Sequence, residues 1–444
     1  MARLLLIDQG GFALDFALRC QDAGHEVRWF IRRVERTKDI GRGLLVEPKC
    51  KFVNDWQSWM RWADVVVLTD NTKYIKEIDA WRKRDNVLVV GACAETTQWE
   101  LDRNMGQALM KKCGLAVAPY REFTDYDTAI SFVKKRDEAF VSKPCGDEPD
   151  KSLTYVSKSP ADLVYMLERW KKAKRHKGSF ILQEKVKGVE MAAGGWFGPA
   201  GFIEGWHENF EFKKLMNGDK GPATGEQGTV LHVTAKSKLA DKVLKPFIDE
   251  LHKKNYVGYF DVNCIIDDKG VPYPLEFTMR PGWPTFNIQM ALVEGDPLEW
   301  LIGLAKGLPT NPFQMDRVAL GVVVAIPDYP FSMFTRKDVT GIPVYHSNKV
   351  PPQNFHPCEL MAGTAPHGIN GKVVNLPCQV TAGDYCAIIS GTGETVRQAR
   401  GAAYRNVEKL EIPNSPFWRT DIGMRLKDQL PLIHSKGYAT ELSF

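Results

Sequence analysis

The chain is 444 residues long, a length that favours about three domains over a single hydrophobic core. Hydrophobic residues make up 44% of it and charged residues 25%, a composition that excludes a disordered or fibrous chain. The net charge of +5 is mild, so it suits phosphate-bearing substrates and does not favour nucleic acid as a partner.

The first hundred residues alternate short apolar runs with a helical pattern. The runs lie at 4–7, 27–31, 65–68 and 87–90, and the helix is expected at 12–23. Short apolar runs are typical of strands buried on both faces, and their alternation with helices indicates a parallel sheet. We therefore predict an N-terminal α/β domain of Rossmann-like type over residues 1–101.

Residues 102–318 are predicted to form a second region, with a small lid subdomain at about 118–188. A helix ends near Gly114, and two strands flank Gly188. Segment 209–229 has no periodic pattern and is expected to be a long functional loop. A hairpin is predicted over 259–277, and residues 319–444 are expected to form a C-terminal mixed α/β domain.

Cysteine usage and the N-terminus predict a cytoplasmic protein with no membrane partner. Nine cysteines are scattered without a CxxC pair, which favours reduced thiols over disulfides or zinc. The apolar runs fall well short of the ~20 residues of a membrane helix. The apolar start ends within a few residues at Asp8, unlike a signal peptide.

The predicted hairpin carries two carboxylates, Asp261 and Glu276, with Arg280 just beyond them. Carboxylates on adjacent strands can hold Mg²⁺ while ATP phosphates complete its octahedron. An arginine nearby can bind a phosphate or a carboxylate with two hydrogen bonds. The alternative is a pair of exposed hairpin carboxylates with an unrelated arginine.

Three lysines lie at strand ends or beside glycines: Lys143, Lys151 and Lys213. A lysine in such a place can neutralise phosphate charge in a cleft, as phosphoryl transfer requires. The alternative for each of them is a solvated surface lysine.

Four segments carry longer motifs. They are VSKPCG at 141–146, QEKVKGVE at 183–190, FKKLMNGDKGPATGEQGTV at 212–230 and LEFTMRPGWPT at 275–285. They resemble, in this order, VVKADG, EEFLxGEE, HKRxGDGDxGPNTGGMGAY and LEFNxRFGDPE of the glycinamide ribonucleotide synthetases (phosphoribosylamine–glycine ligases). Shorter matches follow in the family's order at 362–364, 371–374, 391–393, 403–404 and 419–423. The chain is thus identified as a divergent member of this family, and an ATP-grasp fold is expected.

The resemblance implies ATP and Mg²⁺ (or Mn²⁺) as cofactors and assigns residues to them. The nucleotide-binding residues would be Arg103, Lys143, Lys151, Gln183, Glu184, Lys185, Val186 and Glu190. The metal ligands would be Glu276, Asp261 and Thr278, and the catalytic residues Arg280, Lys213 and Asp219. The substrate residues would be Gly10, Gly11, Thr224, Gly225 and Gly282.

The implied reaction joins a carboxylate to an amine through an acyl phosphate made from ATP. The implied partners are an amino acid, glycine as first choice, and a phosphorylated amine or modified nucleotide. The chain would act as a monomer or homodimer. A closing lid should exclude water, and segments 145–153 and 217–229 are candidates for it.

The sequence departs from the family mainly on the acceptor side. The family's GGGGREHA is DQGGFALD at 8–15, its GLAAGKGV is GDEPDKSL at 146–153, and its GDPE is GWPT at 282–285. Three interpretations follow: a ligase with altered substrates, a true phosphoribosylamine–glycine ligase of purine biosynthesis, or a catalytically silent scaffold or binding protein. Retention of the ATP half, with loss of acceptor motifs, favours the first.

Overall fold

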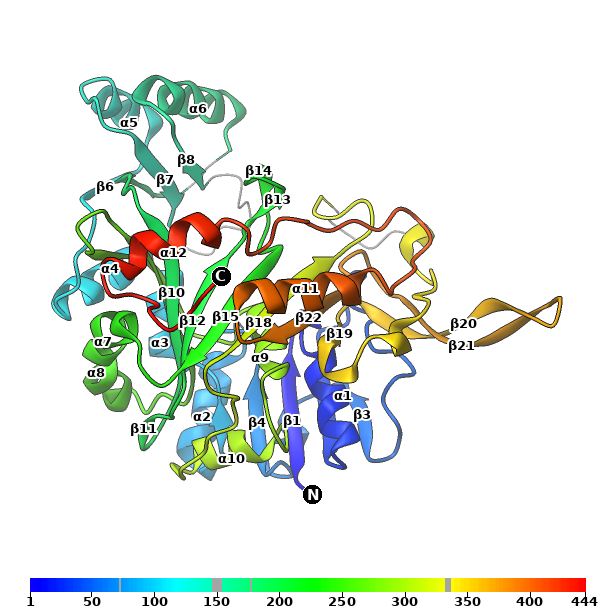
Figure 1. The fold of residues 1–444 in the computed structure, drawn as a ribbon. Coiled ribbons are helices and arrows are strands. Elements are labelled where there is room, and N and C mark those ends of the chain that lie inside the picture. Colours follow the sequence, from blue (N-terminus) through cyan, green and yellow to red (C-terminus); the bar gives the residue numbers. More distant parts are fainter. Residues whose placement is uncertain (72, 146–153, 176–177, 332–336) are drawn as a thin grey trace.

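The computed structural model describes residues 1–71, 73–145, 154–175, 178–331 and 337–444. These residues form a five-stranded, a four-stranded and a nine-stranded sheet, together with two separate hairpins (Figure 1). In the part of the chain so described, no helix has both the length and the apolar character needed to cross a membrane.

The N-terminal sheet is parallel in the order β3-β2-β1-β4-β5, which confirms the predicted α/β class. Alternation along β1 sends Leu4 and Leu6 to one face, against α1, and Leu5 and Ile7 to the other, against α2. The strands are β1 (Arg3–Asp8), β2 (Glu26–Ile31), β3 (Cys50–Val53), β4 (Val65–Leu68) and β5 (Val89–Val90). The helices are α1 (Leu14–Asp22) and α2 (Ile75–Asp85), followed by α3 (Ala94–Leu101) and α4 (Arg103–Lys112).

The four-stranded sheet forms a small separate layer, drawn at the top of Figure 1 with α5 and α6 on its outer side. Its order is β6-β9-β7-β8, all antiparallel. Ser159 caps α6 by accepting from the Asp162 amide, and a proline follows at the first helical position. The elements are β6 (Tyr120–Phe123), α5 (Tyr126–Val133), β7 (Phe140–Pro144), β8 (Tyr155–Val156), α6 (Pro160–Ala173) and β9 (Phe180–Glu184).

The central antiparallel sheet runs β17-β16-β10-β12-β15-β18-β22-β19, with β11 paired to β10. It crosses position 318 without a break, because β15 pairs directly with β18; the division into three domains remains a prediction. Its strands are β10 (Val189–Gly198), β11 (Gly201–Phe202), β12 (Trp206–Glu211), β15 (Gly228–Thr234), β16 (Gly258–Ile266), β17 (Pro272–Thr278), β18 (Arg317–Val324), β19 (Phe355–Pro357) and β22 (Ala387–Gly393). Its helices are α7 (Lys238–Val243), α8 (Ile248–Lys253), α9 (Thr285–Met290), α10 (Glu299–Ala305), α11 (Val396–Val407) and α12 (Leu426–His434).

The structureless loop expected over 209–229 is wrong in detail, because most of this segment is strand. After β12, the chain forms a hairpin of β13 (Lys214–Met216) and β14 (Lys220–Ala223) before β15 begins. Positive φ angles at Gly218 and Asp219 make its turn. The segment is glycine-rich and polar, so it has no hydrophobic periodicity from which its short strands could be predicted. Contacts with the C-terminal segment stabilise these strands instead.

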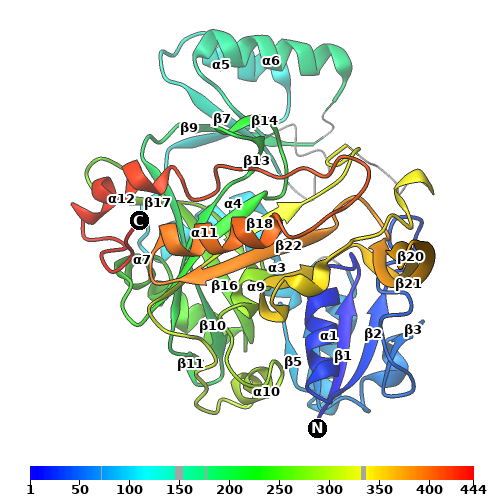
Figure 2. The same cartoon turned by 45° about the vertical axis from the view of Figure 1, so that its right-hand side comes forward.

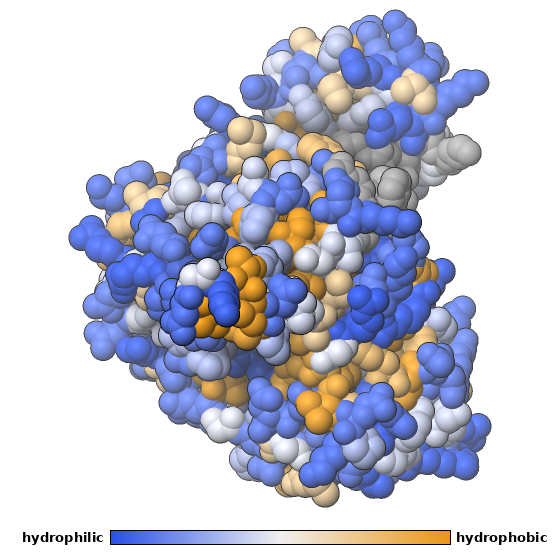
Figure 3. All heavy atoms as spheres, turned by 90° about the vertical axis from the view of Figure 1, so that its right-hand side faces the viewer, coloured by the Kyte–Doolittle hydropathy of each residue, from blue (hydrophilic) through white to orange (hydrophobic). Residues whose placement is uncertain are grey.

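A second hairpin, β20 (Leu360–Ile369) with β21 (Lys372–Thr381), projects from the body as an arm (Figures 1 and 2). Its outer end exposes Ile369, Val373 and Val374. Figure 3 faces this side of the molecule and shows hydrophobic surface in the middle of the view.

A buried polar group joins α1 to the far edge of the central sheet. His356 Nδ1 lies 2.7 Å from Asp15 Oδ2, and its Nε2 lies 2.8 Å from Ser390 Oγ. Arg19 pairs with the other oxygen of Asp15 at 2.7 Å. Because these groups are buried, each needs its partners, and they tie the N-terminal unit to the C-terminal strands.

We expect His356→Ala to lower the free energy of unfolding by about 2–4 kcal/mol, since it leaves the buried Asp15 carboxylate and the Ser390 hydroxyl without one partner each. Chemical denaturation followed by tryptophan fluorescence measures this. His346→Ala is the matched control, because that imidazole is part-exposed and lies 3.7 Å from an exposed Glu411. Equal stability of the two variants would contradict the expectation.

Candidate active site

A group of charged side chains lies on the central sheet around Lys213. Its Nζ is 2.9 Å from Glu190 Oε1, 3.0 Å from Glu211 Oε2 and 3.6 Å from Glu276 Oε1. Although burial alone would lower the pKa of Lys213, the carboxylates raise it well above its usual range. Lys213 in turn keeps the pKa of Glu190 low against the effect of burial. Three carboxyl groups therefore lie around one cation.

Lys143 approaches this cluster from the four-stranded sheet. It lies on β7 and donates to Gln183 Oε1 at 3.2 Å, and Gln183 donates to the Ala118 carbonyl. Burial, and then the charge of Arg103, lowers the pKa of Lys143 to about 8, while Glu276 opposes that change. The two sheets thus present Lys143 and Lys213 to the same region, which is the arrangement needed to hold a polyphosphate.

Arg103, at the start of α4, joins the same region. Its Nε donates to the Pro144 carbonyl at 3.2 Å, and its Nη1 lies 3.7 Å from Glu276 Oε2. Arginine keeps the positive charge that the family places here as lysine. The cations of the region, Arg103, Lys143 and Lys213, therefore surround Glu276.

The hairpin of β16 and β17 offers oxygen donors for a metal ion. Asn263 pairs with Glu276 across the two strands. The Asn263 amide donates to Glu190 and Glu211, but its buried Oδ1 has no hydrogen-bond partner among the described residues. In the same part of the chain no three His, Cys, Asp or Glu side chains form a metal site by themselves. A carboxylate beside an unpaired amide oxygen fits Mg²⁺ that takes its other ligands from phosphates and water.

Asp261 and Thr278 are paired two positions further along the hairpin. Asp261 is buried and accepts from Asn209 at 2.9 Å. Burial, and then the charge of Glu211, raises the pKa of Asp261 well above its usual range. Metal binding by Asp261 and Thr278 stays a prediction, as does the expectation that Asp261 or Asn263 compensates for Thr278, which stands where the family has a metal-binding asparagine.

The segment after β9 borders a hollow of about 870 Å³ between the four-stranded sheet, the central sheet and α12. Glu184, Lys185 and Val186 line it together with the 266–268 turn. Lys185 Nζ donates to the Ser157 carbonyl at 3.1 Å. These three residues thus form the connection between two sheets, where the family resemblance places the adenine contacts.

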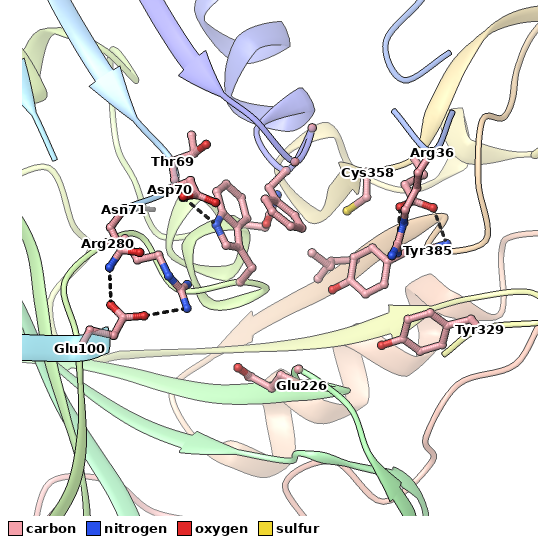
Figure 4. Close-up of a pocket in the computed structure, with 18 of the residues that line it drawn as sticks. Arg36, Thr69, Asp70, Asn71, Glu100, Glu226, Arg280, Tyr329, Cys358 and Tyr385 are labelled. Atoms are coloured by element: carbon pink, nitrogen blue, oxygen red, sulfur yellow. Dashed lines mark hydrogen bonds and ion pairs between the residues drawn. The ribbon is translucent and has the colours of Figure 1, made fainter. Parts of the chain in front are cut away.

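A separate cavity of about 450 Å³ lies between the N-terminal sheet and the central sheet, whose strand β22 forms part of its wall (Figure 4). Arg280 lines it and is fixed by Glu100, whose Oε1 is 3.1 Å from Nη2. Glu100 also accepts from Asn71 at 2.8 Å and from the Met279 amide at 2.7 Å. Arg280 is thereby oriented beside the cavity, and Glu276 lies close enough to help raise the pKa of its guanidinium. Four predicted residues, Gly10, Gly11, Gly225 and Arg280, line this cavity.

In the loop after β1, the carboxyl group of Asp8 bonds the backbone amides that could otherwise bind an anion. Asp8 accepts from the amides of Gly11, Phe12 and Ala13 at 2.9–3.1 Å, and from Trp29 and Thr69. Amides at a helix N-terminus commonly bind phosphate. Here the chain's own carboxylate bonds the amides that lead into α1, from Gly11 to its N-cap Ala13, so the two glycines do not mark an open anion site.

Three other predicted residues are held in structural contacts. Asp219 pairs with Arg419 at 3.0 Å and with Arg425 at 3.1 Å, which fastens the β13–β14 turn to the C-terminal segment. Thr224 donates to the Lys213 carbonyl. Gly282 accepts the Phe286 amide at the start of α9. Their catalytic or substrate roles stay predictions, and Lys151, with most of the 145–153 lid candidate, lies outside the described residues.

Several cavity residues were missed by the sequence motifs. Glu100 ends a helix and Arg36 lies in a loop, and neither position has a local pattern. Glu226 did give a signal, because it stands where the family's substrate loop has a glycine. Its side chain is 93% buried, with a relative exposure of 7%, and its Oε1 has no hydrogen-bond partner in the described part of the structure.

Comparison with known proteins agrees with this geometry. Residues 102–285 match the family model of the phosphoribosylglycinamide synthetase ATP-grasp (A) domain. The chain is 24% identical to a phosphoribosylamine–glycine ligase of Xylella fastidiosa, over 95% of this chain and 96% of that protein. It is 25% identical to the Ralstonia nicotianae enzyme, over 78% and 81%. The solved Thermotoga maritima phosphoribosylamine–glycine ligase aligns with a TM-score of 0.69 at 21% identity, covering 95% of this chain and all of that one.

The fold and the matched region define the class: the chain is an ATP-grasp carbon–nitrogen ligase. Biotin carboxylase of Campylobacter jejuni shares the fold at a TM-score of 0.59 and 11% identity, covering 99% of both chains. Within this class the chain is a divergent relative of the phosphoribosylamine–glycine ligases.

Proposed function

We propose that this chain uses ATP and Mg²⁺ to activate a carboxylate as an acyl phosphate and transfers the acyl group to an amine that differs from phosphoribosylamine. The observation that carries the proposal is the convergence of Lys143, Lys213 and Glu276 from two sheets onto one region. Two cations beside a carboxylate that could hold a metal ion suit a metal-bound triphosphate.

In this proposal the cleft between the two sheets holds the nucleotide. Lys143, Lys213 and Arg103 neutralise its phosphates, and Glu190 and the 184–186 connection hold its nucleoside. Glu276 and Asn263 would bind Mg²⁺, which spreads charge on the transferred phosphoryl group when it is bound. Mn²⁺ has the same preference for oxygen ligands.

The carboxylate substrate lies beside Arg280. A guanidinium fixed by Glu100 can hold a carboxylate with one oxygen toward the γ-phosphate. That oxygen attacks phosphorus and ADP leaves. The amine then attacks the acyl carbon from the 450 Å³ cavity, the bond from carbon to the phosphate oxygen breaks, and the phosphate takes the amine proton. Glycine is the first candidate for the carboxylate.

The Asp8 contacts favour an altered amine over phosphoribosylamine itself. The family's first loop after β1 is changed here, and its amides from Gly11 to Ala13 are bonded by Asp8 from within the chain. A true phosphoribosylamine–glycine ligase of purine biosynthesis is the second candidate, supported by the length over which the relatives align. A silent scaffold is the third, and the retained cation–carboxylate cluster argues against it.

A screen of ADP release tests the proposal. Twenty amino acids are crossed with amines that include phosphoribosylamine generated in place, each with MgATP. ADP release that requires both a carboxylate and an amine supports a ligase, and the productive amine decides between the first two candidates. If MgATP neither binds nor turns over with any mixture, the scaffold interpretation replaces the proposal.

The low pKa of Lys143, about 8, gives a pH dependence. The ammonium form is lost as pH rises through this value, so we expect the Kd for MgATP to increase at higher pH, approaching tenfold per unit well above about pH 8. Titrations from about pH 7 to about pH 9.5 measure it.

Lys143→Arg serves as the matched variant for this titration. A guanidinium stays charged through the range, so its Kd for MgATP should change far less with pH. A wild-type Kd that is constant across the range, or an equal pH slope in the variant, would contradict the role of Lys143.

A further inference from the structure

The cavity beside Arg280 has aromatic walls. Phe12 and Trp283 stack with ring centroids 5.6 Å apart and an angle of 26°. Tyr329 and Tyr385, on the opposite side, lie with centroids 5.6 Å apart. Figure 4 shows both tyrosines on the side away from Arg280 and Glu100. Phe12 is 43% exposed, so this ring has free surface for a ligand. Planar rings are favoured by such walls.

Gly10 is what allows Phe12 to lie there. A Cβ at position 10 would be 2.1 Å from the Phe12 ring, so any other residue would displace the ring. The family motif has glycines here, but it does not place an aromatic residue after them. The pair Gly10 and Phe12 therefore makes a wall that is particular to this chain.

The charges of the cavity do not favour a phosphate. Asp70, Glu100, Glu226 and Glu359 line it, against Arg36 and Arg280. Burial raises the pKa of Glu226 well above its usual range and also raises that of Glu359, so these two offer hydrogen-bonding carboxyl groups more than charge. Each arginine already has a carboxylate partner: Arg280 has Glu100 at 3.1 Å, and Arg36 has Glu359 at 3.5 Å. The amides of Gly11 and Phe12, in the loop just before α1, are bonded by Asp8. A phosphate dianion would find two arginines that are each already balanced by one carboxylate, whereas N–H donors would find carboxyl acceptors.

Glu226 has one carboxyl oxygen, Oε1, that bonds to nothing among the described residues. Its side chain is buried and points into the cavity (Figure 4), and no described group bonds to its Oε1. A buried carboxyl oxygen without a hydrogen bond is rare, because it loses solvation without compensation. A ligand N–H group in the cavity would supply the missing bond.

We propose that this cavity binds an unphosphorylated aromatic amine, a nitrogen heterocycle such as an amino-bearing nucleobase or its nucleoside. Its ring packs on the Phe12–Trp283 pair and its N–H groups donate to Glu226. As the acyl acceptor this ligand rests on the proposed ligase function, but its binding to the cavity does not. The volume of about 450 Å³ is in the range of small-molecule sites.

Binding of cytidine, adenosine and 2-aminopyridine tests this, with ribose 5-phosphate and putrescine as the phosphate and aliphatic probes. Calorimetry is done with saturating MgADP, so that adenosine cannot bind in the nucleotide cleft. At least one aromatic probe should bind, more tightly than ribose 5-phosphate and putrescine. Phe12→Ala and Glu226→Gln should each lower the affinity for that probe about tenfold, because each removes one stacking or hydrogen-bond contact.

Tyr165→Ala and Glu204→Gln are the matched controls, an exposed aromatic and an exposed carboxylate outside the cavity, and both should bind as the wild type does. The proposal is overturned if no aromatic probe binds, if ribose 5-phosphate or putrescine binds more tightly, or if Phe12→Ala leaves affinity unchanged. A separate thermal-shift titration with MgATP reports on the ligase proposal. Failure of that titration alone would remove the ligase and leave the cavity assignment to the calorimetry.

Discussion

Glu276→Gln should reduce ADP formation by about 10²–10³-fold at fixed Mg²⁺, because it removes the charge that holds the metal beside three cations. The amide keeps the size of the side chain, so the fold should be unaffected. Steady-state ADP release measures the change, and a Mg²⁺ titration should show a higher half-saturation concentration in the variant.

Glu408→Gln is the control for this variant, since Glu408 is an exposed carboxylate at the end of α11. It should match the wild type in both measurements. Unchanged ADP release in Glu276→Gln, with intact circular dichroism, would remove the metal assignment from the hairpin.

Arg280→Lys should lower kcat/KM for the carboxylate by about 10²-fold while changing the Kd for MgATP by less than about twofold. A lysine retains the charge next to Glu100 but loses the planar pair of donors. Separate titrations of carboxylate and nucleotide, in a coupled ADP assay, distinguish these two effects.

Arg317→Lys provides the comparison, because Arg317, at the start of β18, pairs at 3.5 Å with an exposed Glu394 just after β22. It should leave both constants as they are. If instead Arg280→Lys weakens MgATP as strongly as it weakens the carboxylate, Arg280 contacts the nucleotide and not the acid substrate.

Local patterns were enough to predict the main elements of the fold. Buried runs such as 4–7 and 65–68 specified a parallel sheet, and the turn at 267–270 specified the β16–β17 hairpin. The β13–β14 hairpin was not predicted. Its turn is held by hydrogen bonds from Arg419 and Arg425 to Asp219, across sequence separations of 200 and 206 residues. Periodicity within a window carries no information about such contacts.

The nucleotide residues were more accessible from sequence than the acceptor residues. Lys143, Glu190, Lys213 and Glu276 lie in recognisable motifs, on strands or, for Lys213, between β12 and β13, and the structure brings them together. For Glu226 and Asn263 the sequence gives no more than a position in a motif or on a strand, and the structure adds that each has a buried oxygen without a hydrogen-bond partner among the described residues. Hydrogen-bond satisfaction depends on packing between distant segments, which a motif does not report.

The two cavities draw on different parts of the chain. The residues proposed to hold the phosphates all fall within 102–285, whereas the aromatic cavity adds Phe12 and Tyr385, which lie outside that range, to Glu226 within it. Substitutions that change which amine is accepted can therefore accumulate in loops that never touch the triphosphate. Such a separation lets a lineage exchange one acceptor for another while its energy-coupling machinery stays under constant selection.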